Sequence, residues 1–247
     1  ATTIPGQSLQ GVMGNAFVQM VGFAFKGYPE LWSAMDGDVG AIMRNMFKER
    51  LGMFAMPKVF DFGFRHVSTG TKVIREVFDI RDLKIRTPVD QDLIALFRAL
   101  GASPLGMNLQ DMIPALRNKV VDGQEGLIPF AQVAQLYNIQ TNLALTYHTW
   151  DGQWICFNNK NWERLPSSLR DVAVAAFETA AKNQREDGAK QEAESRKFLE
   201  ENGMKFNTVE VAGFRAKLKA EGYYAAAKQR VGDELWAALE KNSGRLG

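Results

Sequence analysis

Apolar residues recur at helical spacing in several parts of the chain. Between residues 28 and 50 the spacing is close to that of a helix, but the run 36–40 interrupts it. This pattern predicts two helices or one bent helix. From 90 to 100 apolar residues recur at i, i+3, i+4 and i+7, and Gly101 follows. A helix that ends at this glycine is therefore expected.

Two β-prone segments lie between these helices. Residues 53–64 are apolar and contain Gly63, where we expect a bend. Residues 83–85 alternate as in a strand, and the alternation stops at Arg86, which a Thr-Pro pair follows. The strand therefore delivers Arg86 to its carboxyl end.

A second unit of the same kind follows. We expect a helix over 111–119, with Pro114 in its first turn because a proline deeper inside would remove a hydrogen bond. A short strand at 120–121 and a loop at 122–126 should come next. Alternation of strands and helices predicts an α/β fold with a parallel sheet, in which ligands bind outside the carboxyl ends of the strands.

The second half of the chain contains a long polar segment. Residues 143–158 form two β-prone runs joined by Asp151-Gly152, a pair that favours a two-residue hairpin. Residues 166–202 predict one long helix whose middle is polar on all sides, as in a helix that bridges two bodies. The tail, 222–247, is also expected to be helical.

The composition is that of a globular protein. The chain has 247 residues, of which 46% are hydrophobic, and its net charge of +2 gives no reason to expect nucleic acid as a partner. The single cysteine excludes an internal disulfide. The N-terminus lacks the regions of a signal peptide, and the apolar window 16–25 is too short to span a bilayer. We therefore expect a soluble chain, from which a signal could have been removed before Ala1.

Motifs for catalysis are absent from the sequence. There is no nucleophile elbow, dinucleotide loop, phosphate loop or zinc-peptidase motif, and His66 and His148 are not at metal-ligand spacing. We therefore expect no catalytic residue, no metal and no cofactor. Arg65 and Arg86 each leave a β-prone run. Each pairs with a nearby Asp, extends its charge to solvent, or binds a carboxylate ligand, which guanidinium holds through two parallel hydrogen bonds.

Several motifs together resemble one protein family. The segments DLKIRTP, LGASPLGMNLQDMIPALRNKVVDGQEG and LYNIQTNLALTYHTW, with FGFRHV upstream and LPSSLRD downstream, occur in an order similar to that of the periplasmic solute-binding proteins of TRAP transporters, of DctP type. The likeness covers the chain from about residue 10 onward.

The resemblance implies a two-lobed periplasmic-binding-protein-like α/β fold with a long helix crossing both lobes. Lobe I would comprise 1–62 and 152–190, and lobe II 63–151 and 191–247. It implies a monomeric receptor in the periplasm that closes by a hinge on a small organic anion and delivers it to TRAP membrane permease subunits. In this family the strands near 143–158 cross between lobes, so a hinge competes with the hairpin at Asp151-Gly152.

The resemblance also implies a set of ligand-binding residues. Arg86 matches the arginine that pairs with the substrate carboxylate, and Arg65 matches a second arginine that contacts the ligand in some members. The other expected ligand-binding residues are Phe25, Met107, Leu109, Gln124, Glu125, Gly126, His148 and Trp150. For Met107 and Leu109, packing in the core is an equally good interpretation.

Three departures from the family pattern stand out. The strand–helix units that open the family's first lobe are absent, so we expect a truncated chain or a lobe that lacks half its elements. Gly126 stands where members often carry Asn or Trp, which would leave room for a bulkier acid. Gln110 and Pro114 alter the start of a helix that follows a pocket-lining loop.

Two other classes of function remain open from the residues alone. One is an α/β enzyme acting on an organic acid, with Arg86 as substrate anchor and Asp122 or Glu125 as acid or base. The other is a purely structural or interaction module, which would bind no small molecule.

Overall fold

The structure, a computed structural model, describes residues 1–9 and 11–247. Within these residues the strands form one eight-stranded sheet in the order β1-β7-β3-β6-β4-β5, and β2 and β8 also pair with β7. The strands are β1 (Thr2–Pro5), β2 (Met53–Ala55), β3 (Phe60–Thr69), β4 (Lys84–Thr87), β5 (Ser103–Gly106), β6 (Gly123–Gly126), β7 (Asn142–Asn158) and β8 (Lys205–Thr208).

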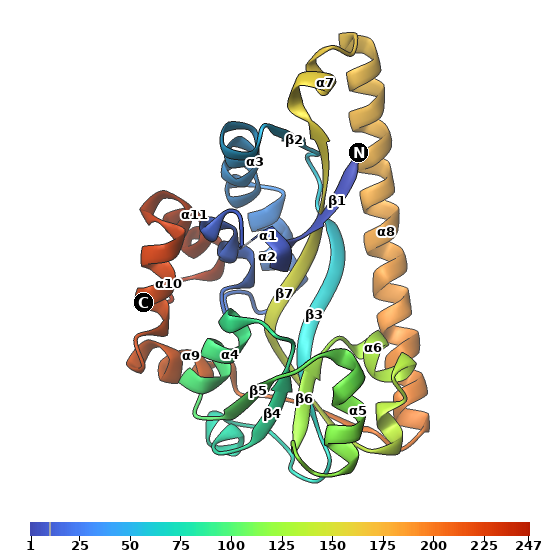
Figure 1. The fold of residues 1–247 in the computed structure, drawn as a ribbon, viewed down its shortest axis with the longest axis vertical. Coiled ribbons are helices and arrows are strands. Elements are labelled where there is room, and N and C mark those ends of the chain that lie inside the picture. The colour runs from blue at the N-terminus through green and yellow to red at the C-terminus, as the bar shows by residue number, and fades with distance from the viewer. Residues whose placement is uncertain (10) are drawn as a thin grey trace. The chain divides into compact units, whose positions relative to one another are not determined.

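Helices make up much of the remaining chain. The α-helices are α1 (Gly6–Leu9), α2 (Tyr28–Met35), α3 (Asp38–Leu51), α4 (Gln91–Ala99), α5 (Leu109–Arg117), α6 (Ile128–Val133), α7 (Asn159–Glu163), α8 (Ser167–Glu201), α9 (Val211–Ala220), α10 (Tyr223–Val231) and α11 (Asp233–Ser243). The 3₁₀ helices in the described ranges are η1 (Gly14–Met20), η2 (Val77–Ile80) and η3 (Leu136–Asn138). The predicted break between α2 and α3 and the long helix α8, unbroken in Figure 1, are both confirmed.

The chain divides into two compact units. Unit 1 comprises 1–63, 149–190 and 226–246, and unit 2 comprises 64–148, 191–225 and residue 247. Strands β3 and β7 and helix α8 each run from one unit into the other (Figure 1). The segment 226–246 belongs to unit 1, where α11 packs against α2 and α3, whereas we had expected it in lobe II.

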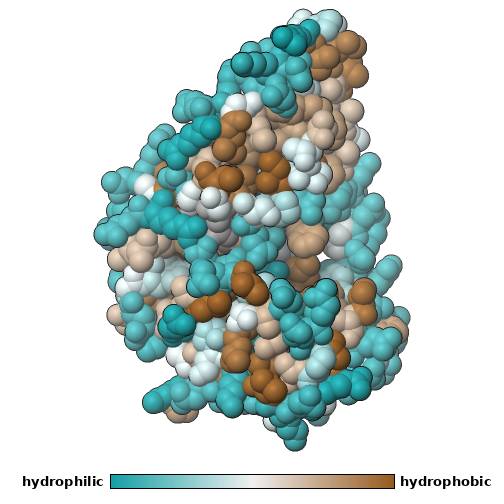
Figure 2. Space-filling view, viewed as in Figure 1, coloured by the Kyte–Doolittle hydropathy of each residue, from teal (hydrophilic) through white to brown (hydrophobic). Residues whose placement is uncertain are grey.

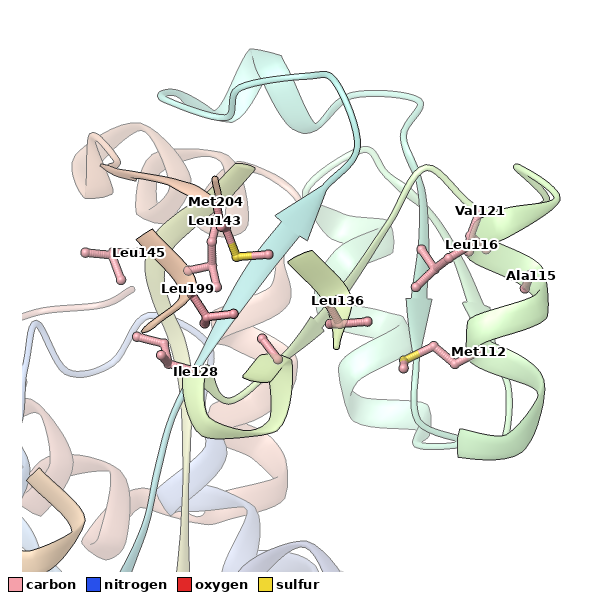
Figure 3. Close-up of a cluster of buried hydrophobic side chains, with 11 residues drawn as sticks. Met112, Ala115, Leu116, Val121, Ile128, Leu136, Leu143, Leu145, Leu199 and Met204 are labelled. Atoms are coloured by element: carbon pink, nitrogen blue, oxygen red, sulfur yellow. The ribbon is translucent and has the colours of Figure 1, made fainter. Parts of the chain in front are cut away.

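The parallel part of the sheet lies in unit 2. Strand β4 is parallel to both β5 and β6, as the strand–helix alternation predicted, while β3 is antiparallel to β6. A cluster of buried apolar side chains from α5, α6, η3, β7 and α8 packs nearby, and Figure 3 shows how these side chains lie. The apolar stripe of α4 is buried as predicted, and Asp90 caps this helix by accepting from the backbone N–H groups of Asp92 and Leu93.

Residues 123–126 form strand β6, so the prediction of a loop there, preceded by a strand at 120–121, was wrong. Glycine and aspartate favour turns, which suggested the loop. The structure gives Gly123 another purpose, because a Cβ at this position would lie 2.4 Å from the backbone oxygen of Ser68 on β3. The glycine allows two strands to approach closely.

Pro114 lies in the second turn of its helix, so its expected position in the first turn was wrong. The helix begins at Leu109, because Asn108 has an extended backbone and acts as its N-cap, which makes Pro114 the sixth helical residue. A proline there leaves the carbonyl of Gln110 without its helical partner. Gln110 is exposed to solvent, so water can bond that carbonyl.

The hairpin predicted at Asp151-Gly152 is also absent, because β7 continues through both residues as one strand of 17 residues. In unit 1 the indole N–H of Trp150 donates to Asp61 Oδ1 at 2.7 Å, and its ring packs edge-on against Trp32. A Cβ on Gly152 would lie 2.1 Å from the Trp150 ring. The glycine therefore serves the packing of Trp150 and not a turn.

Apolar residues reach the surface mainly in separate patches, as the face drawn in Figure 2 shows. Large apolar side chains that are more than half exposed include Val12, Phe78, Val89, Leu109, Val133, Leu169 and Val172. Among the residues that the structure describes, no helix combines the length and apolarity that a membrane-spanning segment requires.

We expect Gly152→Ala to destabilise the protein by about 1–3 kcal/mol, the usual cost of overpacking a core. The Trp150 ring cannot move aside without losing its bond to Asp61 and its contact with Trp32. Chemical denaturation followed by circular dichroism measures the change in the free energy of unfolding.

Gly188→Ala is the matched control, because Gly188 lies inside α8 and an added Cβ would be 3.7 Å or more from its neighbours. This variant should be more stable than the wild type by roughly 0.5–1 kcal/mol, since alanine favours a helix interior. Equal effects of the two substitutions would contradict the role assigned to Gly152.

Candidate functional site

Arg86 lies near the carboxyl end of β4, where the sequence placed it. The preceding residue, Ile85, is fully buried in the core, and alternation along the strand turns Arg86 to the other face. Only 5% of Arg86 is exposed. Its Nε and Nη2 donate to the backbone oxygen of Met107, just after β5, at 3.1 and 2.8 Å. The guanidinium is thus held at the edge where parallel strands bind ligands.

Arg65 on β3 forms a buried ion pair with Glu125 on β6. Its Nε donates to Oε2 and its Nη2 to Oε1, both at 2.6 Å, which is the bidentate geometry of guanidinium and carboxylate. Glu125 is fully buried. The register explains the meeting, because Val67 is the partner of Glu125 and Arg65, two residues earlier, shares its face of the sheet.

His148 on β7 is a third member of this group. Its Nε2 lies 3.2 Å from Glu125 Oε2, and its Nδ1 lies 2.7 Å from the hydroxyl of Thr146. Burial lowers the pKa of His148, while the hydrogen bond and charge of Glu125 oppose this shift. The ring is therefore neutral at pH 7, and the proton on Nε2 donates to Glu125 while Nδ1 accepts from Thr146.

The charges of Arg65, Glu125 and Arg86 do not cancel. Burial alone would raise the pKa of Glu125, but the charge and hydrogen bonds of Arg65 lower it to about 2, so the carboxylate stays ionised. Burial lowers the pKa of Arg86, the nearby charge of Glu125 raises it, and Arg65 lowers it. Arg86 remains a cation all the same. Within the part of the chain that the structure describes, Arg86 has no ion-pair partner within 4.0 Å.

Gln124 points to the opposite face of the sheet from Glu125. Its Nε2 donates to Ser68 Oγ at 2.9 Å, and that hydroxyl donates to Gln140 Oε1 at 2.6 Å. A Cβ on Gly126 would lie 3.2 Å from Gln124 Oε1. The Gln124 amide already uses the space beside Gly126, so the room expected there for a bulkier acid is small.

The remaining predicted residues have different surroundings. The side chain of Met107 packs against the apolar cluster of unit 2, while its carbonyl holds Arg86. Leu109 begins α5 and is 51% exposed. Phe25 and Trp150 are buried in unit 1. Ligand contact by any of these residues stays a prediction.

Sequence reasoning missed Thr146 and the Met107 carbonyl. Thr146 was detectable, because it lies two residues before His148 on the same strand and so shares its face. The carbonyl gives no signal in a sequence. Asp122, one of the residues considered as an acid or base, lies beside Lys84 at the start of β4 and away from Arg86.

A separate groove of about 910 Å³ lies at the other end of these strands. Leu83, Val121 and Ile139 are among its lining residues, and so are the cations Lys72, Arg117 and Lys119. It lies at the amino ends of β4 and β6, whereas ligands of such sheets bind at the carboxyl ends. Among the described residues, no group of three or more His, Cys, Asp or Glu side chains could hold a metal ion.

Comparison with known proteins places the chain among solute receptors. The family described as "Bacterial extracellular solute-binding protein, family 7" (DctP) matches residues 3–229. The sialic acid-binding periplasmic protein SiaP of Vibrio cholerae is 24% identical over 81% of this chain and 62% of its own length. A solute-binding protein of Roseobacter denitrificans is 27% identical over 88% of this chain and 66% of its own length. The chain thus spans just under two thirds of these relatives.

Solved structures agree with the fold. A TRAP periplasmic solute-binding protein from Ochrobactrum anthropi, whose C-terminus occupies its ligand-binding pocket, has a TM-score of 0.88 and 26% identity, covering 97% of this chain and 76% of that one. A TRAP protein from Roseobacter denitrificans with bound β-D-glucuronate has a TM-score of 0.84 and 24% identity, covering 98% and 79%.

These matches confirm the resemblance on which the sequence analysis relied, and the α/β fold with it. The family is one of solute-binding proteins and not of enzymes. Because the family model matches residues 3–229, the chain belongs to the bacterial extracellular solute-binding proteins of family 7.

Proposed function

We propose that this chain is part of a periplasmic receptor that captures a small organic acid for a TRAP-type transporter, and that Arg86 binds the carboxylate. The observation that carries the proposal concerns Arg86: it is a nearly buried cation at the carboxyl end of a parallel strand, and no anion among the described residues pairs with it. Burial of an unpaired charge is unfavourable, and a ligand carboxylate would remove that penalty.

The hydrogen bonds of Arg86 leave the Nη1 atom of its guanidinium available. Nε and Nη2 bond the Met107 carbonyl, and no other residue in the described ranges contacts the Arg86 guanidinium through a hydrogen bond. Hydrogen bonds to charged groups contribute about 1.5–3 kcal/mol each. One or two of them would fix the carboxylate of a small acid and orient the rest of the molecule.

The charge balance favours an acid with a single carboxylate. Arg65 and Glu125 neutralise each other and His148 is neutral, so Arg86 supplies one positive charge in this part of unit 2. The named ligands of several relatives fit this class, since sialic acid, glucuronate, galacturonate and D-erythronate each carry one carboxylate and several hydroxyls. We infer a hydroxylated monocarboxylate as the solute.

The family supports a proposal for the membrane partners and the location. Relatives are named as periplasmic proteins and as components of TRAP systems, which supports a periplasmic receptor that works with membrane permease subunits. We propose that it acts as a monomer and without nucleic acid.

The alternative of an enzyme that uses Glu125 as acid or base has little support. This carboxylate is fully buried, stays ionised because its pKa is about 2, and has both oxygens bonded to Arg65. A general acid or base must exchange protons near the working pH.

One prediction from the proposed function concerns the solute and its anchor. In a thermal-shift panel, D-glucuronate, D-galacturonate or D-erythronate should stabilise the wild type, by about 2.7 kcal/mol at 100 times the dissociation constant. Succinate, with two carboxylates, should act more weakly. Arg86→Met should abolish the shift, because it removes the charge and the fork while keeping similar bulk.

Arg81→Met is the matched control, because Arg81 is an exposed arginine at the surface of the same unit. It should leave the shift unchanged. An acid that stabilises the Arg86→Met protein as strongly as the wild type would show that the anchor lies elsewhere.

Another prediction from the proposed function concerns pH. The dissociation constant should change little as the pH falls from about 8 to 6.5, because Glu125 stays charged and burial keeps the pKa of His148 below its ordinary value. Binding should weaken below about pH 4, where the carboxylate of the ligand takes up a proton and loses its charge. Isothermal titration calorimetry across this range measures the profile. A transition near pH 6.5 would contradict the assignment, since it would mean that His148 titrates at its ordinary pKa.

A further inference from the structure

The face of the sheet that carries Arg86 also carries two buried polar atoms that have no hydrogen-bond partner among the described residues. Arg86 pairs with Gln124 in the parallel register of β4 and β6, and His66 pairs with Gly126 in the antiparallel register of β3 and β6. Paired residues share a face, and so do residues two positions apart on one strand. All four residues therefore lie on one face, and Gly126 and His66 form the row nearer the carboxyl end of β6.

Neighbouring hydrogen bonds fix the direction of the Gln124 amide. Its Nε2 donates to the Ser68 hydroxyl at 2.9 Å, and that hydroxyl gives its own proton to Gln140 Oε1 at 2.6 Å. A reversed amide would place an oxygen beside a hydroxyl that has no proton left for it. Gln124 Oε1 therefore points away from Ser68 and lies over Gly126, where a Cβ would be 3.2 Å from it. Gln124 is 2% exposed, and within residues 1–9 and 11–247 this oxygen accepts no hydrogen bond.

The ring of His66 is fixed by Tyr147. The backbone N–H of Tyr147 donates to His66 Nδ1 at 3.3 Å, and the two rings pack edge-on at a centroid distance of 4.6 Å. Burial lowers the pKa of His66 to about 3, so the ring is neutral at pH 7 and its single proton is on Nε2. Only 1% of His66 is exposed, and Nε2 has no hydrogen-bond partner in the part of the chain that the structure describes.

A hydroxyl group satisfies both of these atoms. His66 Nε2 can only donate a hydrogen bond, and Gln124 Oε1 can only accept one. A hydroxyl accepts one bond and donates another, whereas a second carboxylate could not donate to the amide oxygen and an ammonium could not accept from the imidazole. A buried polar atom without a partner is unfavourable, so a solute that supplies a hydroxyl here gains affinity from both bonds. The Gln124 amide leaves little space over Gly126, which suits a group of this size.

We propose that His66 and Gln124 form a donor–acceptor pair that binds one hydroxyl of the solute while Arg86 binds its carboxylate. This inference rests on the proposed function and deepens it, because it identifies the residues that distinguish a hydroxylated acid from its deoxy analogue. Gln124 was expected to contact the ligand. His66 was not, because a single histidine in a strand carries no signal for such a role in a sequence.

The test compares D-erythronate with its three monodeoxy analogues, each of which lacks one hydroxyl, by isothermal titration calorimetry. The wild type should bind one of the three on the order of a hundredfold more weakly than D-erythronate, because that analogue leaves both buried atoms without a partner. Gln124→Met and His66→Asn should each bind D-erythronate and that analogue with affinities within about threefold of each other. If a uronate binds more tightly in the thermal-shift panel, its monodeoxy analogues take the place of these acids.

His66→Asn separates recognition of the hydroxyl from support of the fold. The asparagine oxygen can take the place of Nδ1 and accept from the Tyr147 N–H, while no donor remains at the position of Nε2. If His66 only supports Tyr147, the asparagine variant will keep the wild-type preference for D-erythronate over the analogue. That result would overturn the inference, and so would an unchanged preference in Gln124→Met.

Gln140→Met is the matched control for Gln124→Met. Gln140 is as deeply buried and bonds the same Ser68, but both of its amide atoms have protein partners. The Ser68 oxygen can still accept from Gln124 in this variant, so the preference for D-erythronate over the analogue should equal that of the wild type. A control variant that loses the preference as fully as Gln124→Met would contradict the role assigned to Gln124 Oε1.

A crystal structure of the wild type without solute tests the pair independently of any acid. An ordered water should bond both His66 Nε2 and Gln124 Oε1, because water offers the same acceptor and donor as a hydroxyl. A direct bond between these two atoms, or a His66 ring turned toward another protein group, would overturn the inference. If the water is present but no acid of the panel binds, then the proposed function fails and the pair stands as a site for the hydroxyl of another solute.

Discussion

The ion pair between Arg65 and Glu125 fixes the strands that carry the candidate site. Both ions are buried, so each loses its hydration, and their attraction offsets that cost only when the geometry and the remaining hydrogen bonds are good. Here both carboxylate oxygens are bonded. A slip of β3 by one residue against β6 would carry Arg65 to the other face and leave Glu125 buried without a partner. The pair thus specifies the register of this sheet more than it adds to its stability.

A consequence of this pairing is that the site has a surplus charge. Arg65, Glu125 and Arg86 lie on the adjacent strands β3, β6 and β4, with Arg86 on the face opposite to the other two, and the bidentate pair takes one cation and the one anion. Arg86 is left as a buried cation that, within residues 1–9 and 11–247, forms hydrogen bonds with a neutral carbonyl alone. A buried, unpaired cation lowers the stability of the ligand-free protein. It also raises the affinity for an anion, so the site gains affinity at a cost in stability.

Sequence patterns predicted the parts of this arrangement that are local. The stripe of α4, the break between α2 and α3 and the place of Arg86 at a strand end all follow from residues a few positions apart. The partner of Arg65 could not be predicted in this way, because Glu125 lies 60 positions further along the chain. Strands β3 and β6 must pair before the two groups meet, and neither periodicity nor composition encodes that pairing. The contact between Thr146 and His148 was easier to predict, since alternate residues of a strand share a face.

The two errors in strand assignment have one physical cause. Gly123 and Gly152 each follow an aspartate, and the Asp-Gly pair reads as a turn because glycine tolerates backbone angles that other residues avoid. In this chain the missing Cβ serves a close approach instead, of a backbone oxygen at Gly123 and of the Trp150 ring at Gly152. Local sequence cannot distinguish a glycine kept for its angles from one kept for its size. Both glycines lie on strands that carry site residues, where close approach positions Glu125 next to Arg65 and continues β7 past His148. The residues that sequence analysis interpreted least well are therefore the ones that let the sheet assemble around its buried charges.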